Sequence, residues 1–176
     1  DSSYLQRSPD FRSELGFIRR VDMKETQHEA GYNWFPTNSP VLRVGADVEL
    51  GAVWDYSNQL QDWNVEPGFE IEFPGQTELG VRSWEFFERY EGIEFRRRSM
   101  MIYASTEWLK WVSARVGVDW GGNINYYPAD GTEPFLATGK SVDAGVTLRP
   151  FSQLRIDQAY IYSALDTREG TPLPAG

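Results

Sequence analysis

The sequence has no cysteine, a single histidine at position 28, and no apolar run that approaches the length of a membrane-spanning helix. Without cysteine the chain can form no disulfide framework. His28, with no cysteine or second histidine, does not supply the ligand set of a transition-metal site, so we expect no bound metal. The missing apolar run excludes a helical membrane protein, since such a helix needs about 20 predominantly apolar residues.

Basic residues are also fewer than acidic residues. The 17 Lys and Arg residues face 26 Asp and Glu residues, which gives a net charge of −9 and argues against nucleic acid as a partner. The mean hydropathy of −0.51 resembles that of a soluble chain. It does not exclude a β-barrel, because alternate residues of barrel strands face water or the lumen and dilute the apolar signal.

What the sequence does contain is a long alternation of apolar and polar residues between positions 42 and 73. Every even-numbered position from Leu42 to Tyr56 is apolar, a period of two that a helix would not produce. After a polar turn at 58–61, the apolar residues resume on odd-numbered positions from Trp63 to Phe73. Two such runs in succession predict a long antiparallel hairpin.

The length of these runs indicates the environment of the strands. Strands of soluble domains have about 5 to 6 residues, whereas a tilted strand that crosses a bilayer needs about 9 to 11. Similar alternation recurs later in the chain and predicts about eight strands. We therefore predict an all-β fold, an antiparallel up-and-down transmembrane β-barrel or part of one.

The predicted barrel segment covers residues 24–168. Residues 1–23 form an N-terminal segment, either a loop or a short strand. Residues 169–176 contain Pro and Gly and are expected to be a truncated loop rather than a closing strand. Because no export signal is present at the start either, we expect the chain to be part of a longer protein.

Connection lengths and aromatic residues predict the orientation of the strands. Short turns near positions 36, 74, 109 and 151 alternate with longer connections near 58, 90 and 130. The connection near 90 is predicted to be a long loop that covers residues 84–97. Bacterial barrels have short periplasmic turns and long outer loops, and aromatic girdles at both membrane interfaces. The predicted outer girdle is Trp54, Tyr56, Trp63, Trp120 and Tyr162, and the predicted periplasmic girdle is Trp34, Phe73, Trp108, Trp111 and Phe151.

The polar face is expected to line a lumen, because its many glycines suit a crowded interior better than an exposed surface. Its charged residues are Asp47, Glu49, Glu66, Glu70, Glu72, Glu78, Asp119, Arg43, Arg82 and Arg115. Close carboxylates can hold cations, which suggests a cation-preferring wall. The interpretation that we favour is a solvated ladder of carboxylates balanced by the three arginines.

A run of three arginines and the abundance of carboxylates suggest two further kinds of site. Arg96, Arg97 and Arg98 could hold lipopolysaccharide phosphates, although a solvated charge run is the more common explanation. Glycosidases use two carboxylates, but Asp and Glu occur on nearly every predicted strand, and no acid/base constellation stands out. We therefore expect no catalytic residue, no cofactor and no enzymatic activity in this segment, with outer-membrane lipid and lipopolysaccharide as partners.

Four stretches resemble a family of large bacterial outer-membrane proteins: residues 10–22 (DFRSELGFIRRVD), 62–73 (DWNVEPGFEIEF), the hairpin 107–120 and 148–165 (LRPFSQLRIDQAYIYSAL). Members pair an N-terminal carbohydrate-binding module of the family 9 type with a C-terminal β-barrel of unknown function, and some are labelled membrane-associated hydrolases. The resemblance implies that this chain is part of the barrel, located in the bacterial outer membrane and acting as a membrane anchor or pore. Carbohydrate binding or hydrolysis would then reside in a domain that this chain lacks.

The strongest alternative is a soluble β-sandwich carbohydrate-binding module. Its tryptophans and tyrosines would stack on sugars. It would turn its apolar stripes inward and gather these aromatic residues in one groove or face.

Overall fold

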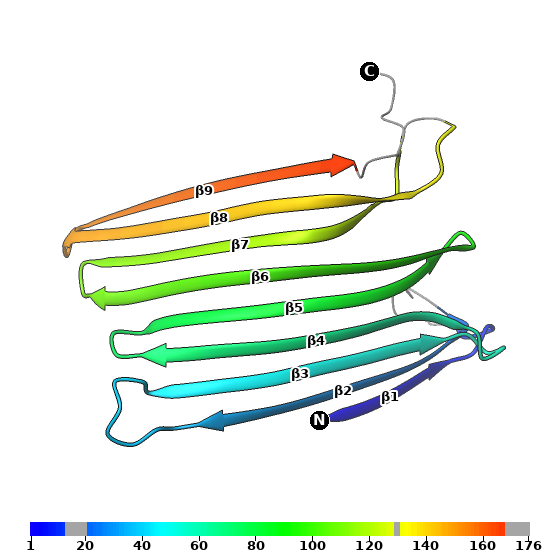
Figure 1. Ribbon diagram of the computed structural model, residues 1–176, viewed down its shortest axis with the longest axis horizontal. Helices are drawn as coiled ribbons and strands as arrows, with labels where there is room; N and C mark the ends of the chain where they lie inside the picture. The colour runs from blue at the N-terminus through cyan, green and yellow to red at the C-terminus, as the bar shows by residue number, and fades with distance from the viewer. Residues whose placement is uncertain (13–20, 129–130, 168–176) are drawn as a thin grey trace.

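The computed structural model describes residues 1–12, 21–128 and 131–167, which form a single sheet of nine antiparallel strands (Figure 1). Each strand pairs with its neighbours in the sequence, so the sheet is an up-and-down meander and its first and last strands run in the same direction. The strands are β1 (Ser2–Arg7), β2 (Met23–Trp34), β3 (Arg43–Trp54), β4 (Leu60–Phe73), β5 (Thr77–Tyr90), β6 (Ile93–Leu109), β7 (Val112–Asn125), β8 (Phe135–Phe151) and β9 (Leu154–Thr167).

The predicted all-β, antiparallel, up-and-down architecture is confirmed, but the sheet is open. β1 pairs only with β2, and β9 pairs only with β8, so the two outer strands are edges. The strand count is nine rather than eight because a short strand, β1, lies in the N-terminal segment 1–23. Residues 169–176 lie outside the described residues. No helix in the described part of the chain could span a membrane.

The predicted long loop at 84–97 is wrong. β5 continues to Tyr90, β6 begins at Ile93, and a two-residue turn at Glu91 and Gly92 joins them. Both turn residues have positive φ, 51° and 82°, as tight hairpin turns require. The strand pattern was hidden because both faces carry aromatic and charged residues here, so polar and apolar positions no longer alternate.

The predicted alternation of short and long connections is also wrong. The connection 35–42, expected to be a short turn, is longer than 55–59 and 91–92, which were expected to be long. Connection length therefore gives no orientation for the sheet.

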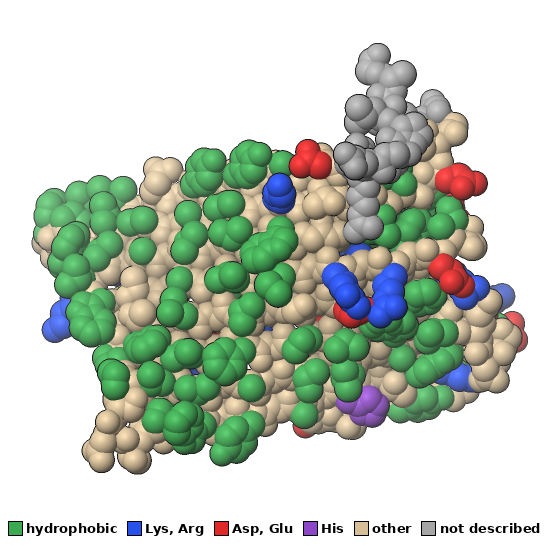
Figure 2. Space-filling view, viewed as in Figure 1, with side chains coloured by type: hydrophobic (Ala, Val, Ile, Leu, Met, Phe, Trp, Pro, Cys, Tyr) green, Lys and Arg blue, Asp and Glu red, His purple; other side chains and the backbone are tan. Residues whose placement is uncertain are grey.

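Pairing aligns the apolar residues of eight strands in rows. One complete row runs from β2 to β9 through Tyr32, Ala46, Phe69, Val81, Ile102, Val118, Val142 and Tyr162. The next row toward the 74–76 turn runs through Trp34, Val44, Ile71, Leu79, Ala104, Val116, Ala144 and Tyr160. Figure 2 shows hydrophobic side chains spread over this face with few charged ones among them. The sheet thus has one apolar and one polar face, as the alternation predicts.

The sheet has almost no core of its own. Among the described hydrophobic residues, only Met23, Phe95, Ile124 and Ala137 are buried. Ile102, near the middle of the apolar face, remains 52% exposed. No second layer of the described chain covers this face.

The turn at 55–59 is closed by a carboxylate. Ser57 Oγ donates a hydrogen bond to Asp55 Oδ1 at 2.6 Å, and the backbone N–H of Gln59 donates to the same oxygen at 2.8 Å. The Ser57 hydroxyl and these neighbouring donors hold the pKa of Asp55 below its ordinary value.

Gly121 provides a test of the β6–β7 pairing. Its φ of +152° disfavours other residues, and an added Cβ would overlap the backbone of Arg98 and Ser99. Gly139 lies directly opposite in β8, where an added Cβ would meet no atom closer than 3.7 Å. We expect Gly121→Ala to lower the free energy of unfolding by about 1 to 3 kcal/mol. Gly139→Ala should leave it unchanged or raise it by about 0.5 kcal/mol. Urea titration in detergent measures the free energy of unfolding of both variants. Equal effects would contradict the close approach of the β6 backbone to Gly121.

Candidate functional site

Ion pairs cross the polar face between neighbouring strands. The Arg43 guanidinium in β3 contacts Glu70 of β4 and also donates to Glu72 of the same strand at 3.1 Å. Its Nη1 donates to Asn33 Oδ1 of β2 at 3.0 Å. One arginine therefore joins three strands and contacts two carboxylates, which leaves this group with one net negative charge.

Two more arginines extend this pattern. Arg82 of β5 lies 2.9 Å from Asp47 of β3, across the intervening Gly68 of β4. Arg115 of β7 lies 3.6 Å from Asp143 of β8. Each of the three arginines predicted for the ladder, Arg43, Arg82 and Arg115, thus lies within ion-pair distance of a carboxylate.

Glycines make room for these large side chains. Along one polar-face row, every second residue is glycine: Asn33, Gly45, Glu70, Gly80, Tyr103, Gly117 and Asp143. The Tyr103 ring of β6 lies over Gly80 of β5, where a Cβ would overlap the ring. From there its hydroxyl donates to Glu70 of β4 at 3.2 Å. Missing side chains on one strand thus allow contacts between the strands on either side.

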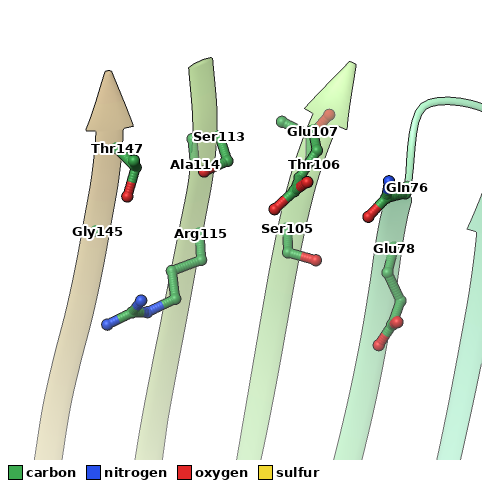
Figure 3. A pocket seen from close by; sticks show the side chains of 10 residues that line it. All are labelled: Gln76, Glu78, Ser105, Thr106, Glu107, Ser113, Ala114, Arg115, Gly145 and Thr147. Atoms are coloured by element: carbon green, nitrogen blue, oxygen red, sulfur yellow. The ribbon is translucent and has the colours of Figure 1, made fainter. Parts of the chain in front are cut away.

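The polar face is hollowed near the 74–76 turn, where a depression of about 320 Å³ is lined by ten residues (Figure 3). Glu78 lies at one side and Arg115 at the other, Ser105 of the intervening strand β6 lies between them, and Glu107 also lines the depression. Figure 3 shows the Arg115 guanidinium directed away from Glu78, toward the Gly145 strand. The depression therefore has separated opposite charges with a hydroxyl-bearing floor.

Some carboxylates have no such compensation. Glu49 of β3 and Glu66 of β4 are directly opposite each other, and neither forms an ion pair within the described residues. Asn64 donates to Glu66 at 2.9 Å, and Ser141 contacts Asp119. No three Asp, Glu or His residues of the described chain are grouped closely enough to hold a metal ion. Of the seven carboxylates predicted for the ladder, Asp47, Glu70 and Glu72 form ion pairs with its arginines. The cation preference of the wall stays a prediction.

The structure separates Arg96, Arg97 and Arg98. Arg96 and Arg98 lie on the apolar face, and both contact Glu85 of β5. Arg97 lies on the polar face, with its guanidinium carbon 4.4 Å from the centre of the Phe86 ring. The three residues do not form one cluster.

The predicted girdle residues lie obliquely across the strands. Relative to the apolar row through Phe69, Trp54 of β3 is displaced by eight residues, Trp63 of β4 by six, Trp120 of β7 by two and Tyr162 of β9 by none. At the other ends of the strands, Trp34, Phe73 and Trp108 are displaced by two, four and six residues in β2, β4 and β6. Both bands therefore shift in the same direction across the sheet. Tyr56 and Trp111 lie in turns, and Phe151 ends β8.

Sequence reasoning missed Tyr103, Asp143 and Glu85 as partners in these contacts. Tyr103 could have been found from the Gly80 opposite it, once the β5–β6 register was known. Because the turn at 91–92 was not predicted, neither the β5–β6 register nor the contact between Tyr103 and Gly80 could be predicted.

Two of the ion pairs allow a matched test. The Arg82–Asp47 pair is half-buried and closely spaced, whereas the Arg115–Asp143 pair is more exposed and longer. We expect a double-mutant cycle with Arg82→Gln and Asp47→Asn to give a coupling of about 0.5 to 1 kcal/mol. The same cycle with Arg115→Gln and Asp143→Asn should give about zero. Urea unfolding measures both coupling free energies. A larger coupling for Arg115 and Asp143 than for Arg82 and Asp47 would contradict the proposed contribution of the closer pair to stability.

Comparison with protein-family models, curated proteins and solved structures finds no match for this chain. The resemblance to outer-membrane proteins therefore stays a hypothesis drawn from the residues themselves.

Proposed function

We propose that this chain is a membrane-spanning section of a β-barrel in the bacterial outer membrane, serving as an anchor or as part of a pore wall. The apolar face would contact lipid, and the polar face would line the interior. The edges β1 and β9 would pair with further strands. The observation that carries the proposal is the oblique course of the two aromatic bands.

The slope of the bands supports this reading. Strands of outer-membrane barrels tilt by about 35–45°, lie about 4.8 Å apart and rise about 3.4 Å per residue. Residues at equal height should therefore shift by about 1.2 residues from one strand to the next. Between Trp63 in β4 and Tyr162 in β9, the outer band shifts by six residues over five strands. This is the shift that a tilted sheet needs to place the band level with one interface.

The spacing of the bands supports it as well. In β4, Trp63 and Phe73 are ten residues apart, which corresponds to about 25 Å along the normal of a membrane with tilted strands. The apolar belt of outer-membrane barrels is also about 25 Å tall. The polar face between these levels carries the ion pairs and glycines that a narrow, wet interior would require.

A soluble β-sandwich carbohydrate-binding module is less well supported. A sandwich packs a second sheet against the apolar face, and the described residues supply only one sheet. A sugar-binding groove would give no reason for two parallel aromatic bands. Coupling to carbohydrate binding or hydrolysis depends on the family resemblance alone and would belong to another domain.

Neighbouring residues of β6 test which face meets lipid. Ile102 lies on the apolar face and Met101 on the polar face. An arginine on the lipid face near the bilayer centre costs about 2 to 4 kcal/mol, whereas the polar face would keep it in water. We expect Ile102→Arg to reduce the fraction of protein that floats with phosphatidylcholine vesicles at least about tenfold, and Met101→Arg to change it less than about twofold. A wild-type chain that stays in buffer would overturn the proposal.

The pore version of the proposal makes a separate prediction. The uncompensated carboxylates Glu49 and Glu66 would attract cations into a water-filled interior. In planar bilayers we expect the double substitution Glu49→Gln and Glu66→Gln to lower the cation-to-anion permeability ratio. Glu94→Gln, on the other face, should not change this ratio. Anion preference of the wild type, or equal effects of both changes, would exclude a cation-preferring wall.

A further inference from the structure

The apolar face changes character toward the beginning of β6. Reading back along the strand, its residues on this face are Ala104, Ile102 and Met100, followed by Arg98 and Arg96. Arg98 is displaced by four residues from the central apolar row, between the displacements of six for Trp63 and two for Trp120. Arg98 therefore occupies the place of β6 in the outer aromatic band, and Arg96 lies just beyond it. Figure 2 shows two basic side chains beside an acidic one within the hydrophobic face.

Glu85 holds the two guanidinium groups together. Arg96 Nε donates to Glu85 Oε1 at 2.6 Å, and Arg98 Nη2 donates to the same oxygen at 3.0 Å. The Glu85 side chain is only 24% exposed, whereas those of Arg96 and Arg98 are 62% and 71% exposed. The carboxylate thus lies beneath two arginines, and the group as a whole carries one positive charge.

This arrangement leaves hydrogen-bonding capacity at the surface. Two guanidinium groups carry ten N–H donors in planar forks, which match the oxygen atoms of phosphate. The contacts with Glu85 involve three of their nitrogen atoms. The remaining donors are available to an anion that approaches from outside the sheet.

An aromatic pair borders the arginines. The Arg96 guanidinium carbon lies 5.5 Å from the centre of the Trp63 ring, a cation–π geometry. Trp63 stacks with Phe87 at a centroid distance of 6.5 Å and an interplanar angle of 7°. A ligand held here would therefore have its charged group at the arginines and an apolar part beside the rings.

We propose that Arg96 and Arg98, positioned by Glu85 and bordered by Trp63 and Phe87, bind the phosphate group of a membrane lipid. Arg97 takes no part, because its side chain lies on the polar face. The inference rests on the proposed function, since it requires that the apolar face meets a bilayer. At the level of the outer band the site would lie among the headgroups, where lipid phosphates are found.

The test uses the full chain in uncharged detergent, titrated with a short-chain phosphatidic acid and followed by native mass spectrometry. We expect the double substitution Arg96→Gln and Arg98→Gln to weaken binding about tenfold or more, because it removes the charge-assisted hydrogen bonds to phosphate. The matched control Arg97→Gln should bind within about twofold of the wild type. The double substitution Arg96→Lys and Arg98→Lys, which keeps the charge without the planar forks, should fall between these values.

Several outcomes would overturn the site. These are equal losses in the Arg97→Gln control and the double glutamine variant, the same affinity for phosphatidylcholine as for phosphatidic acid, or full displacement of the lipid by an equal concentration of inorganic phosphate. Flotation with pure phosphatidylcholine vesicles separates the two proposals. A wild type that floats but does not prefer the phosphatidic acid overturns the site alone, whereas one that does not float overturns the membrane function as well.

Discussion

The constraint on which this structure depends is the register of the antiparallel ladder. Because strand residues alternate between faces, a slip of one residue in any pair would bring apolar side chains of one strand into the polar face of the next. The pairing keeps the faces separate from β2 to β9, through a row that begins and ends with tyrosine, Tyr32 and Tyr162. With almost no buried core, the chain depends on backbone pairing and on whatever covers the apolar face.

The polar face is stabilised differently. There, large side chains alternate with glycine, so that Tyr103 and Arg82 can reach across an intervening strand to Glu70 and Asp47. Each of these contacts joins strands that are already hydrogen-bonded to a common neighbour. The result is a cross-linked polar surface, which resists shear between strands without any packing from a second layer.

The sequence predicted the parts of the fold in which one face is wholly apolar. The hairpin of β3 and β4 could be read from the alternation, whereas the register between β7 and β8 was not predicted. Residues 84–97 could not be read in this way, because Trp84 and Phe86 point to the polar face while Glu85 and Arg96 point to the apolar one. The individual charges of the ladder were predictable, but their partners required the exact registers of β3–β4, β4–β5 and β7–β8, which the alternation alone does not give.

The direction of the outer strands has a geometric consequence. In a closed ring whose neighbours all run antiparallel, directions must alternate around the circle, so the total number of strands is even. β1 and β9 run the same way, and joining them to each other would create a parallel seam between edges of very different length. A closed, all-antiparallel barrel that contains this sheet must therefore have an odd number of additional strands between β9 and β1.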